Sequence, residues 1–184
     1  ENGVLKERVY KSGGLYGEAI VEIVKWLKLA QGVAENQAQG EALGLLIDYY
    51  NTGSLQTWDD YNVAWTAATE GNIDYINSFI EVYNDPVGYR GSYETIVQIK
   101  DFDMSAKMAV LSENAQWFED NSPLMQEHKK DKVVGVSYKT VNVAGEAGDA
   151  SPSTPIGVNL PNANWIRAEV GSKSVSLGNI INAY

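Results

Sequence analysis

Apolar residues recur at helical spacing through most of the first two-thirds of the chain, and this pattern stops after Lys132. Short runs rich in β-branched residues follow, and such runs favour strands over helices. A chain in which helices come first and strands follow is typical of an α+β protein, because it does not alternate strands with crossover helices. We therefore predict an α+β fold with a helical N-terminal two-thirds and a β-rich C-terminal third.

The helical part contains amphipathic segments with recognisable ends. Gly32 and Gly53 follow two of these segments, and Pro86 disfavours helical geometry in the residue before it. The most regular segment carries apolar residues at helical spacing between Met104 and Phe118. The predicted helices span residues 18–30, 34–50, 57–69, 72–84 and 104–118.

Short β-branched runs predict strands, and we expect the later strands to pair with the first. The predicted strands span residues 93–100, 133–143, 156–160 and 175–177, and small residues at 144–154 predict a loop. The chain then divides into a helical part, residues 1–92, and a part with a strand, a long helix and the β-rich segment, residues 93–184.

The net charge of −10 at pH 7 narrows the classes of partner. A negative field repels phosphate groups, so we expect neither nucleic acid nor an anionic membrane surface to bind. The same field attracts a peptide with a free amino terminus, although weakly at physiological salt. The sequence also has no run of ~20 apolar residues that could span a bilayer.

The chain carries few side chains suited to catalysis. It has no cysteine, and its one histidine, His128, lies in a charged run that favours an exposed turn. A His-Glu-x-x-His zinc site needs two imidazoles one helical turn apart, and serine-type catalysis would need the same histidine as its base. We therefore predict no catalytic residue and no metal ligand in this chain.

The run Glu81-Val82-Tyr83-Asn84-Asp85-Pro86 is a candidate for peptide binding. An extended backbone would put Glu81 and Tyr83 on the same side, where a carboxylate and a phenol could hold an ammonium group and a peptide carbonyl. A helical backbone would instead leave Glu81 in solvent and put Tyr83 at the end of an apolar stripe.

The run Asn159-Leu160-Pro161-Asn162 is a second candidate. Pro161 stiffens a corner, and the amides of Asn159 and Asn162 can both donate and accept hydrogen bonds, which suits recognition of a peptide backbone. An ordinary Asn-rich turn explains the same residues.

Together with their neighbours, these runs resemble the dipeptidyl peptidase III family of zinc exopeptidases. Matching runs occur in the order and at the spacing of that family: residues 81–86 with Gly88 and 90–91, then 104–107, 155–162 and 175–179. The resemblance is specific over residues 70–184 and less distinctive before them.

The resemblance implies a two-lobed peptidase with a wide cleft, which removes dipeptides from peptide N-termini. One lobe carries a zinc-binding helix, and the other has a β-barrel-like core and contacts the peptide. It further implies that Glu81, Asn159 and Asn162 hold the amino terminus of the substrate and that Tyr83 contacts its backbone. The implied cofactor of the parent enzyme is zinc, and the implied location is the cytoplasm.

The chain departs from the family because it lacks the His-Glu-x-x-Gly-His zinc motif, which the resemblance places beyond Tyr184. We therefore expect an inactive fragment of a larger enzyme. Its expected partners are short peptides and the remainder of the parent peptidase, and it should bind no zinc itself. The alternative is a stand-alone acidic module that binds peptides or proteins without catalysis. A zinc motif encoded soon after Tyr184 would favour the first hypothesis, and a stop codon there would favour the second.

Overall fold

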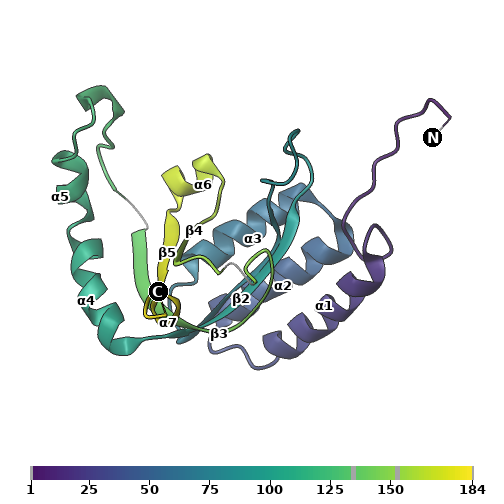
Figure 1. Cartoon of the computed structure of the whole chain (residues 1–184), viewed down its shortest axis with the longest axis horizontal. Coiled ribbons are helices and arrows are strands. Elements are labelled where there is room, and N and C mark those ends of the chain that lie inside the picture. Colours follow the sequence, from purple (N-terminus) through teal and green to yellow (C-terminus); the bar gives the residue numbers. More distant parts are fainter. Residues whose placement is uncertain (1, 134–135, 152–153, 184) are drawn as a thin grey trace. The chain divides into compact units, whose positions relative to one another are not determined.

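The computed structural model describes residues 2–133, 136–151 and 154–183, and the chain divides into two compact units (Figure 1). The first unit runs from Glu1 to Glu70 and the second from Gly71 to Tyr184. The division expected from the sequence, between residues 92 and 93, therefore falls inside the second unit.

The first unit is helical, as the periodicity predicts. Its helices are α1 (Gly17–Gln31), α2 (Gln37–Thr52) and α3 (Leu55–Ala67), and α2 packs against both of the others. Gly53 ends α2 with a φ of 70°, a left-handed conformation that glycine adopts without steric cost. The N-cap of α3 is Ser54, whose side chain accepts a hydrogen bond from the Thr57 backbone, so this helix begins earlier than its predicted start at residue 57.

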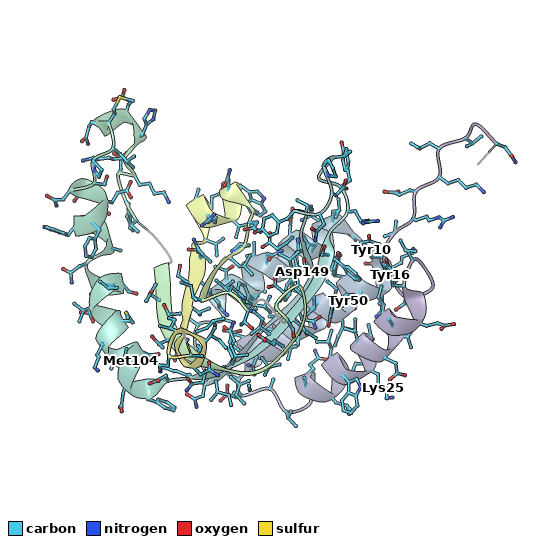
Figure 2. All side chains as sticks on the ribbon, in the orientation of Figure 1. Tyr10, Tyr16, Lys25, Tyr50, Met104 and Asp149 are labelled. Atoms are coloured by element: carbon cyan, nitrogen blue, oxygen red, sulfur yellow. The ribbon has the colours of Figure 1, made fainter. Side chains whose placement is uncertain are left out.

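The core of the first unit combines aliphatic and aromatic side chains. Ile20, Leu46 and Tyr50 are fully buried, and burial of a side chain of this size contributes about 1.5–3 kcal/mol. Tyr50 is labelled in Figure 2. The ring of Trp58 lies 5.0 Å from that of Tyr49, a spacing at which tilted aromatic rings attract one another. These contacts connect α2 to α3.

The second unit is built on a mixed sheet with short helices. In its described residues, five strands are hydrogen-bonded in the order β1-β2-β3-β5-β4. β3 and β5 are parallel, whereas the other neighbouring strands are antiparallel. The strands are β1 (Ile73–Glu81), β2 (Ser92–Lys100), β3 (Val136–Gly148), β4 (Gly157–Leu160) and β5 (Ser172–Leu177). The helices are α4 (Phe102–Glu113), α5 (Ala115–Asp120), η1 (Gln126–His128), α6 (Asn164–Glu169) and α7 (Gly178–Ile181).

The predicted α+β class is confirmed, because helices come first and the sheet follows. β2 pairs with β3, as expected for the strands after Val133. Across the described ranges, no helix is both long and apolar enough to cross a membrane.

The helix predicted at residues 72–84 is wrong, since this segment forms β1 followed by a turn. Ile73, Ile76 and Ile80 match helical spacing, yet their β-branched side chains suit a strand equally well. β1 pairs with β2 in an antiparallel register along most of its length. Hydrogen bonding to a strand later in the chain therefore decides the outcome, and the local pattern does not show it.

Other boundaries also differ from the prediction. The helix predicted at 104–118 is divided between α4 and α5 at Asn114, whose side chain donates a hydrogen bond to the Val110 carbonyl. β3 continues through Gly148, so it includes part of the segment predicted as a loop. The short helix α6 was not predicted. Residues 134–135 and 152–153 of the predicted strand and loop lie outside the described residues.

Polar side chains connect β1 with the opposite side of the sheet. Lys173 of β5 and Asp74 of β1 form an ion pair with 2.8 Å between Nζ and Oδ2. At the other end of β1, Glu81 contacts Asn162, which follows β4. A flat sheet would hold β1 far from β5 and from the end of β4, so these contacts show that the sheet curls toward a barrel.

Side-chain hydrogen bonds attach two helices of the second unit to β3. Ser105 of α4 donates from Oγ to the Thr140 carbonyl (2.9 Å) and accepts from the Thr140 N–H (3.1 Å). The side-chain amide of Asn179 in α7 likewise donates to the Val143 carbonyl and accepts from the Val143 N–H. Both residues lie in runs that resemble the peptidase family, and in this fold they hold helices in place.

Candidate functional site

The candidate site begins at the end of β1 with Glu81. Its carboxylate accepts hydrogen bonds from the side-chain Nδ2 of Asn162, at 3.2 Å to Oε1 and 3.4 Å to Oε2. Leu160 and Pro161 are buried, and the chain then emerges so that Asn162 is exposed. The buried corner thus directs the amide of Asn162 to a carboxylate 81 residues earlier in the sequence.

Tyr83 lies beside Glu81 and is 82% exposed. A hydrogen bond to the Glu81 carboxylate, together with its negative charge, raises the pKa of Tyr83 above the usual 10.0. The phenol therefore stays protonated near neutral pH and can donate a hydrogen bond. The structure brings Glu81, Tyr83 and Asn162 together, although the two predicted runs are far apart in the sequence.

Asn159 is held by a different partner. It lies in β4 opposite Ser174 of β5, and the Ser174 hydroxyl donates to its Oδ1 at 3.1 Å. β4 is the last strand in the order of the sheet. Asn159 is therefore on an edge strand, three positions before Asn162, with its amide oxygen engaged by the neighbouring strand.

Two further carboxylates, which the sequence analysis did not identify, extend this acidic group, because Glu94 interacts with both Glu81 and Asp149. Glu94 in β2 is only 9% exposed, and burial raises the pKa of its carboxyl above the usual range. The negative charges of Glu81 and Asp149 raise that pKa further. Asp149, labelled in Figure 2, follows β3 and is tied to β2 by a hydrogen bond from its N–H to the Tyr93 carbonyl.

A signal for Glu94 was present in the sequence. Ile96 and Gln98 follow it at alternate positions of the same strand, and both are buried in the structure. Alternating residues of a strand face the same side of a sheet, so this pattern assigns Glu94 to the inward face. An acid at an inward position is uncommon unless it has a role or a partner.

The acid-rich arrangement suits an organic cation better than a metal ion. The carboxylates of Glu81 and Asp149 both repel that of Glu94, and a positive charge placed beside Glu94 would relieve that repulsion. Throughout residues 2–133, 136–151 and 154–183, however, no three His, Cys, Asp or Glu side chains group closely enough to hold a metal ion. An ammonium group needs hydrogen-bond acceptors and a nearby negative charge, which carboxylates supply.

Comparison with known proteins identifies a family over nearly the whole chain. The profile of Peptidase family M49 matches residues 2–184. The chain is 32% identical over 171 residues to dipeptidyl peptidase 3 of Nematostella vectensis, and 30% identical over 168 residues to that of Homo sapiens. These alignments cover 93% and 91% of this chain, but only 23% and 22% of the two relatives.

Solved structures give the same result for the fold. The structure of DPP III from Caldithrix abyssi is similar to this chain with a TM-score of 0.79 and 25% sequence identity. The match covers 92% of this chain and 32% of that structure. The similarity therefore extends over both units, and this chain spans a minor part of each protein it matches.

Proposed function

The chain belongs to peptidase family M49, and from this premise we propose that it is the peptide-binding portion of a longer, zinc-dependent dipeptidyl peptidase. In this proposal, Glu81, Asn159 and Asn162 hold the amino terminus of a peptide, and Tyr83 contacts the peptide backbone. The proposal for a longer parent is supported by the short span of the curated relatives that the chain covers.

The observation that carries the proposal is the contact between Asn162 and Glu81. This contact joins two polar runs that are far apart in the sequence, so the fold must bring them together. The Glu81 carboxylate supplies a charge opposite to an ammonium group, and the amide oxygen of Asn162 is a further acceptor for its protons. Glu94, whose carboxyl interacts with both Glu81 and Asp149, adds to the acidic character of this place.

The edge strand β4 offers a path for the rest of the peptide. An edge strand presents backbone N–H and C=O groups along its outer side, and an extended peptide can pair with them. β4 ends two residues before Asn162. A peptide whose amino terminus lies at Glu81 could therefore run antiparallel to β4, past Asn159.

The residues of this chain do not fit a zinc ion, because the chain has one histidine and no cysteine and its described acidic residues form no metal-binding group. Zinc and the hydrolytic step are accordingly assigned to the remainder of the parent. The part played by this chain is to fix the amino terminus, which sets the distance from that terminus to the bond that is cut. The family resemblance also supports a cytoplasmic location for the parent.

A stand-alone binding module is the second hypothesis, and the acidic cluster formed by Glu81, Glu94 and Asp149 would suit such a protein equally well. The coding sequence after Tyr184 separates the two. A His-Glu-x-x-Gly-His motif there would support the peptidase, and a stop codon would support the module.

We predict that the 184-residue chain binds a peptide with a free amino terminus more tightly than its acetylated form. Acetylation removes the positive charge, so the carboxylate of Glu81 would lose its ionic partner. Titration of tetra-alanine amide, followed by NMR shifts of residues 81–83 and 159–162, should give a Kd about tenfold or more below that of the acetylated peptide. Equal binding of both peptides, or shifts elsewhere only, would contradict the proposed site.

We also predict that the chain by itself does not hydrolyse dipeptidyl substrates. The chain has one histidine and no cysteine, and His128 lies in the exposed segment η1. Release of arylamine from a dipeptidyl-arylamide should equal the rate in buffer, with and without excess zinc. Zinc-dependent turnover by the pure chain would show that the catalytic machinery had been assigned to the wrong part of the protein.

A further inference from the structure

The loop between β1 and β2, residues 82–91, is closed around the carboxylate of Asp85. One oxygen, Oδ1, accepts a hydrogen bond from the Val87 N–H at 3.1 Å. The other, Oδ2, accepts from the N–H groups of Tyr89 at 3.0 Å and Arg90 at 2.8 Å. A single side chain therefore holds three backbone groups spread over four residues.

Backbone hydrogen bonds complete the same turn. The Asp85 N–H donates to the Val82 carbonyl, and the Gly88 N–H donates to the Asp85 carbonyl, both at 3.0 Å. Gly88 has a φ of 73°, in the left-handed region that a residue with a Cβ rarely enters. Asp85 thus connects the part of the loop that leaves β1 with the part that returns to β2.

Apolar packing contributes little to the order of this loop. Val87 is 71% exposed and Tyr89 is 90% exposed, so neither side chain buries much surface. A loop without such burial depends on its hydrogen bonds for a fixed conformation. The hydrogen bonds to Asp85 are therefore the main contacts that can order residues 85–90.

The carboxylate of Asp85 is held in its ionised form. Hydrogen bonds from the backbone of Val87 and Arg90 lower the pKa of Asp85 below the usual 3.8, and the charge of Arg90 adds to the effect. A lowered pKa means that the folded loop favours the anion. The contribution of this carboxylate to the closed loop is therefore present near neutral pH and is lost as the pH falls through the lowered pKa.

Tyr83 lies on this loop, two residues before Asp85 and two residues after Glu81. We propose that Asp85 is a positioning residue for the peptide site, because its carboxylate orders the loop and so keeps Tyr83 beside Glu81. This inference rests on the proposed function, since the contact between Tyr83 and a peptide is itself proposed. Asp85 acts through Tyr83 and does not touch the peptide.

The test is Asp85→Asn in the 184-residue chain. Asparagine keeps the size of the side chain but replaces one of its two acceptor oxygens with an NH₂ group, so it can no longer accept from Val87 and also from Tyr89 and Arg90. Amide hydrogen exchange should accelerate about tenfold or more at whichever of these N–H groups lose their acceptor. The pKa of Tyr83, followed by NMR of a ¹³C-labelled ring, should fall toward the ordinary 10.0 as the phenol leaves Glu81.

Peptide binding provides the functional measurement. The Kd for tetra-alanine amide should rise about tenfold in Asp85→Asn, and the same change in a Tyr83→Phe background should have little further effect. Asn84→Ala is the matched control in the same loop, because the Asn84 side chain makes a single long hydrogen bond, 3.5 Å to Ser92. It should leave the Tyr83 titration and the peptide affinity unchanged.

The outcomes separate this role from the proposed function. An unchanged Tyr83 titration and unchanged loop exchange in Asp85→Asn would overturn the role of Asp85, whether or not any peptide binds. Equal weakening by Asp85→Asn with and without the Tyr83 hydroxyl would also overturn it, because Asp85 would then act by another route. Failure of the unaltered chain to bind any peptide would instead refute the proposed function, and the titration of Tyr83 would still test the loop.

Discussion

Glu81→Ala is expected to weaken capture of a peptide amino terminus by about 2–4 kcal/mol, which corresponds to a loss of ~30- to 800-fold. The carboxylate provides the charge opposite to the bound ammonium group, and truncating it would leave a partly desolvated cation with amide acceptors only. Asn162 would also lose the acceptor to which it now donates. In the parent peptidase the loss should appear in kcat/KM, because a displaced amino terminus also displaces the bond to be cut.

Acetylated substrate provides the control for the effect of Glu81→Ala. Acetylation should impose a similar penalty on the unaltered enzyme and little further penalty on the variant, since both changes remove the same ionic interaction. Glu113→Ala, at an exposed position of α4, should change neither kcat/KM nor the penalty of acetylation by more than a small factor. Additive penalties from acetylation and Glu81→Ala would mean that the amino terminus is bound elsewhere.

The two halves of the candidate site could be identified from residue types and spacing, whereas only the family resemblance implied that they meet. Residue types and spacing indicated a carboxylate beside a phenol at Glu81 and Tyr83, and paired amides at Asn159 and Asn162. The hydrogen bond between Asn162 and Glu81 depends on how the sheet curls, which is set by strand pairings far apart in the chain. Glu94 was missed although its alternation with Ile96 and Gln98 indicated an inward position, and its proximity to Glu81 and Asp149 follows from register rather than from local sequence.

The fold was predictable where one segment carries its own signals. The helices of the first unit have regular apolar stripes and terminal glycines, and the structure has helices there. β1 was misassigned because the spacing of Ile73, Ile76 and Ile80 fits a helix, whereas its pairing with β2 is decided by tertiary contacts. The break at Asn114 was missed because the apolar stripe continues across it, and the stripe does not reveal where the backbone leaves helical geometry.

The ion pair between Lys173 and Asp74 joins residues 99 positions apart. Breaking it is expected to have a large effect on the stability of the second unit. The Lys173 side chain is 5% exposed and that of Asp74 is 27% exposed. Burial lowers the pKa of Lys173 below the usual 10.5, although the charge and the hydrogen bond of Asp74 oppose that shift. Burial of this cation therefore costs free energy of folding, and the ion pair with Asp74 offsets part of that cost.

Lys173→Ala is accordingly expected to destabilise the second unit by about 3 kcal/mol, because it removes the cation that lies 2.8 Å from the half-buried Asp74 carboxylate. The measurement is the free energy of opening from amide hydrogen exchange at Ile96 and Leu177, which are fully buried in this unit. Probes in that unit are needed, because the chain divides into two compact units and a protein of more than one unit need not unfold in a single step.

Two further variants decide whether the loss of stability comes from breaking the ion pair with Asp74. Replacing both partners, Lys173→Met with Asp74→Leu, should recover most of the lost stability, since no charge is then left buried alone. Lys25→Ala, measured at buried residues of α1, breaks an ion pair with Glu22 that has the same 2.8 Å separation but side chains 57% and 61% exposed. Lys25 is labelled in Figure 2. This control should cost no more than about 0.5 kcal/mol, because water and mobile ions screen exposed charges. If the double replacement is as unstable as Lys173→Ala alone, the loss arises from packing of the lysine stem, and the charge of Asp74 is not its cause.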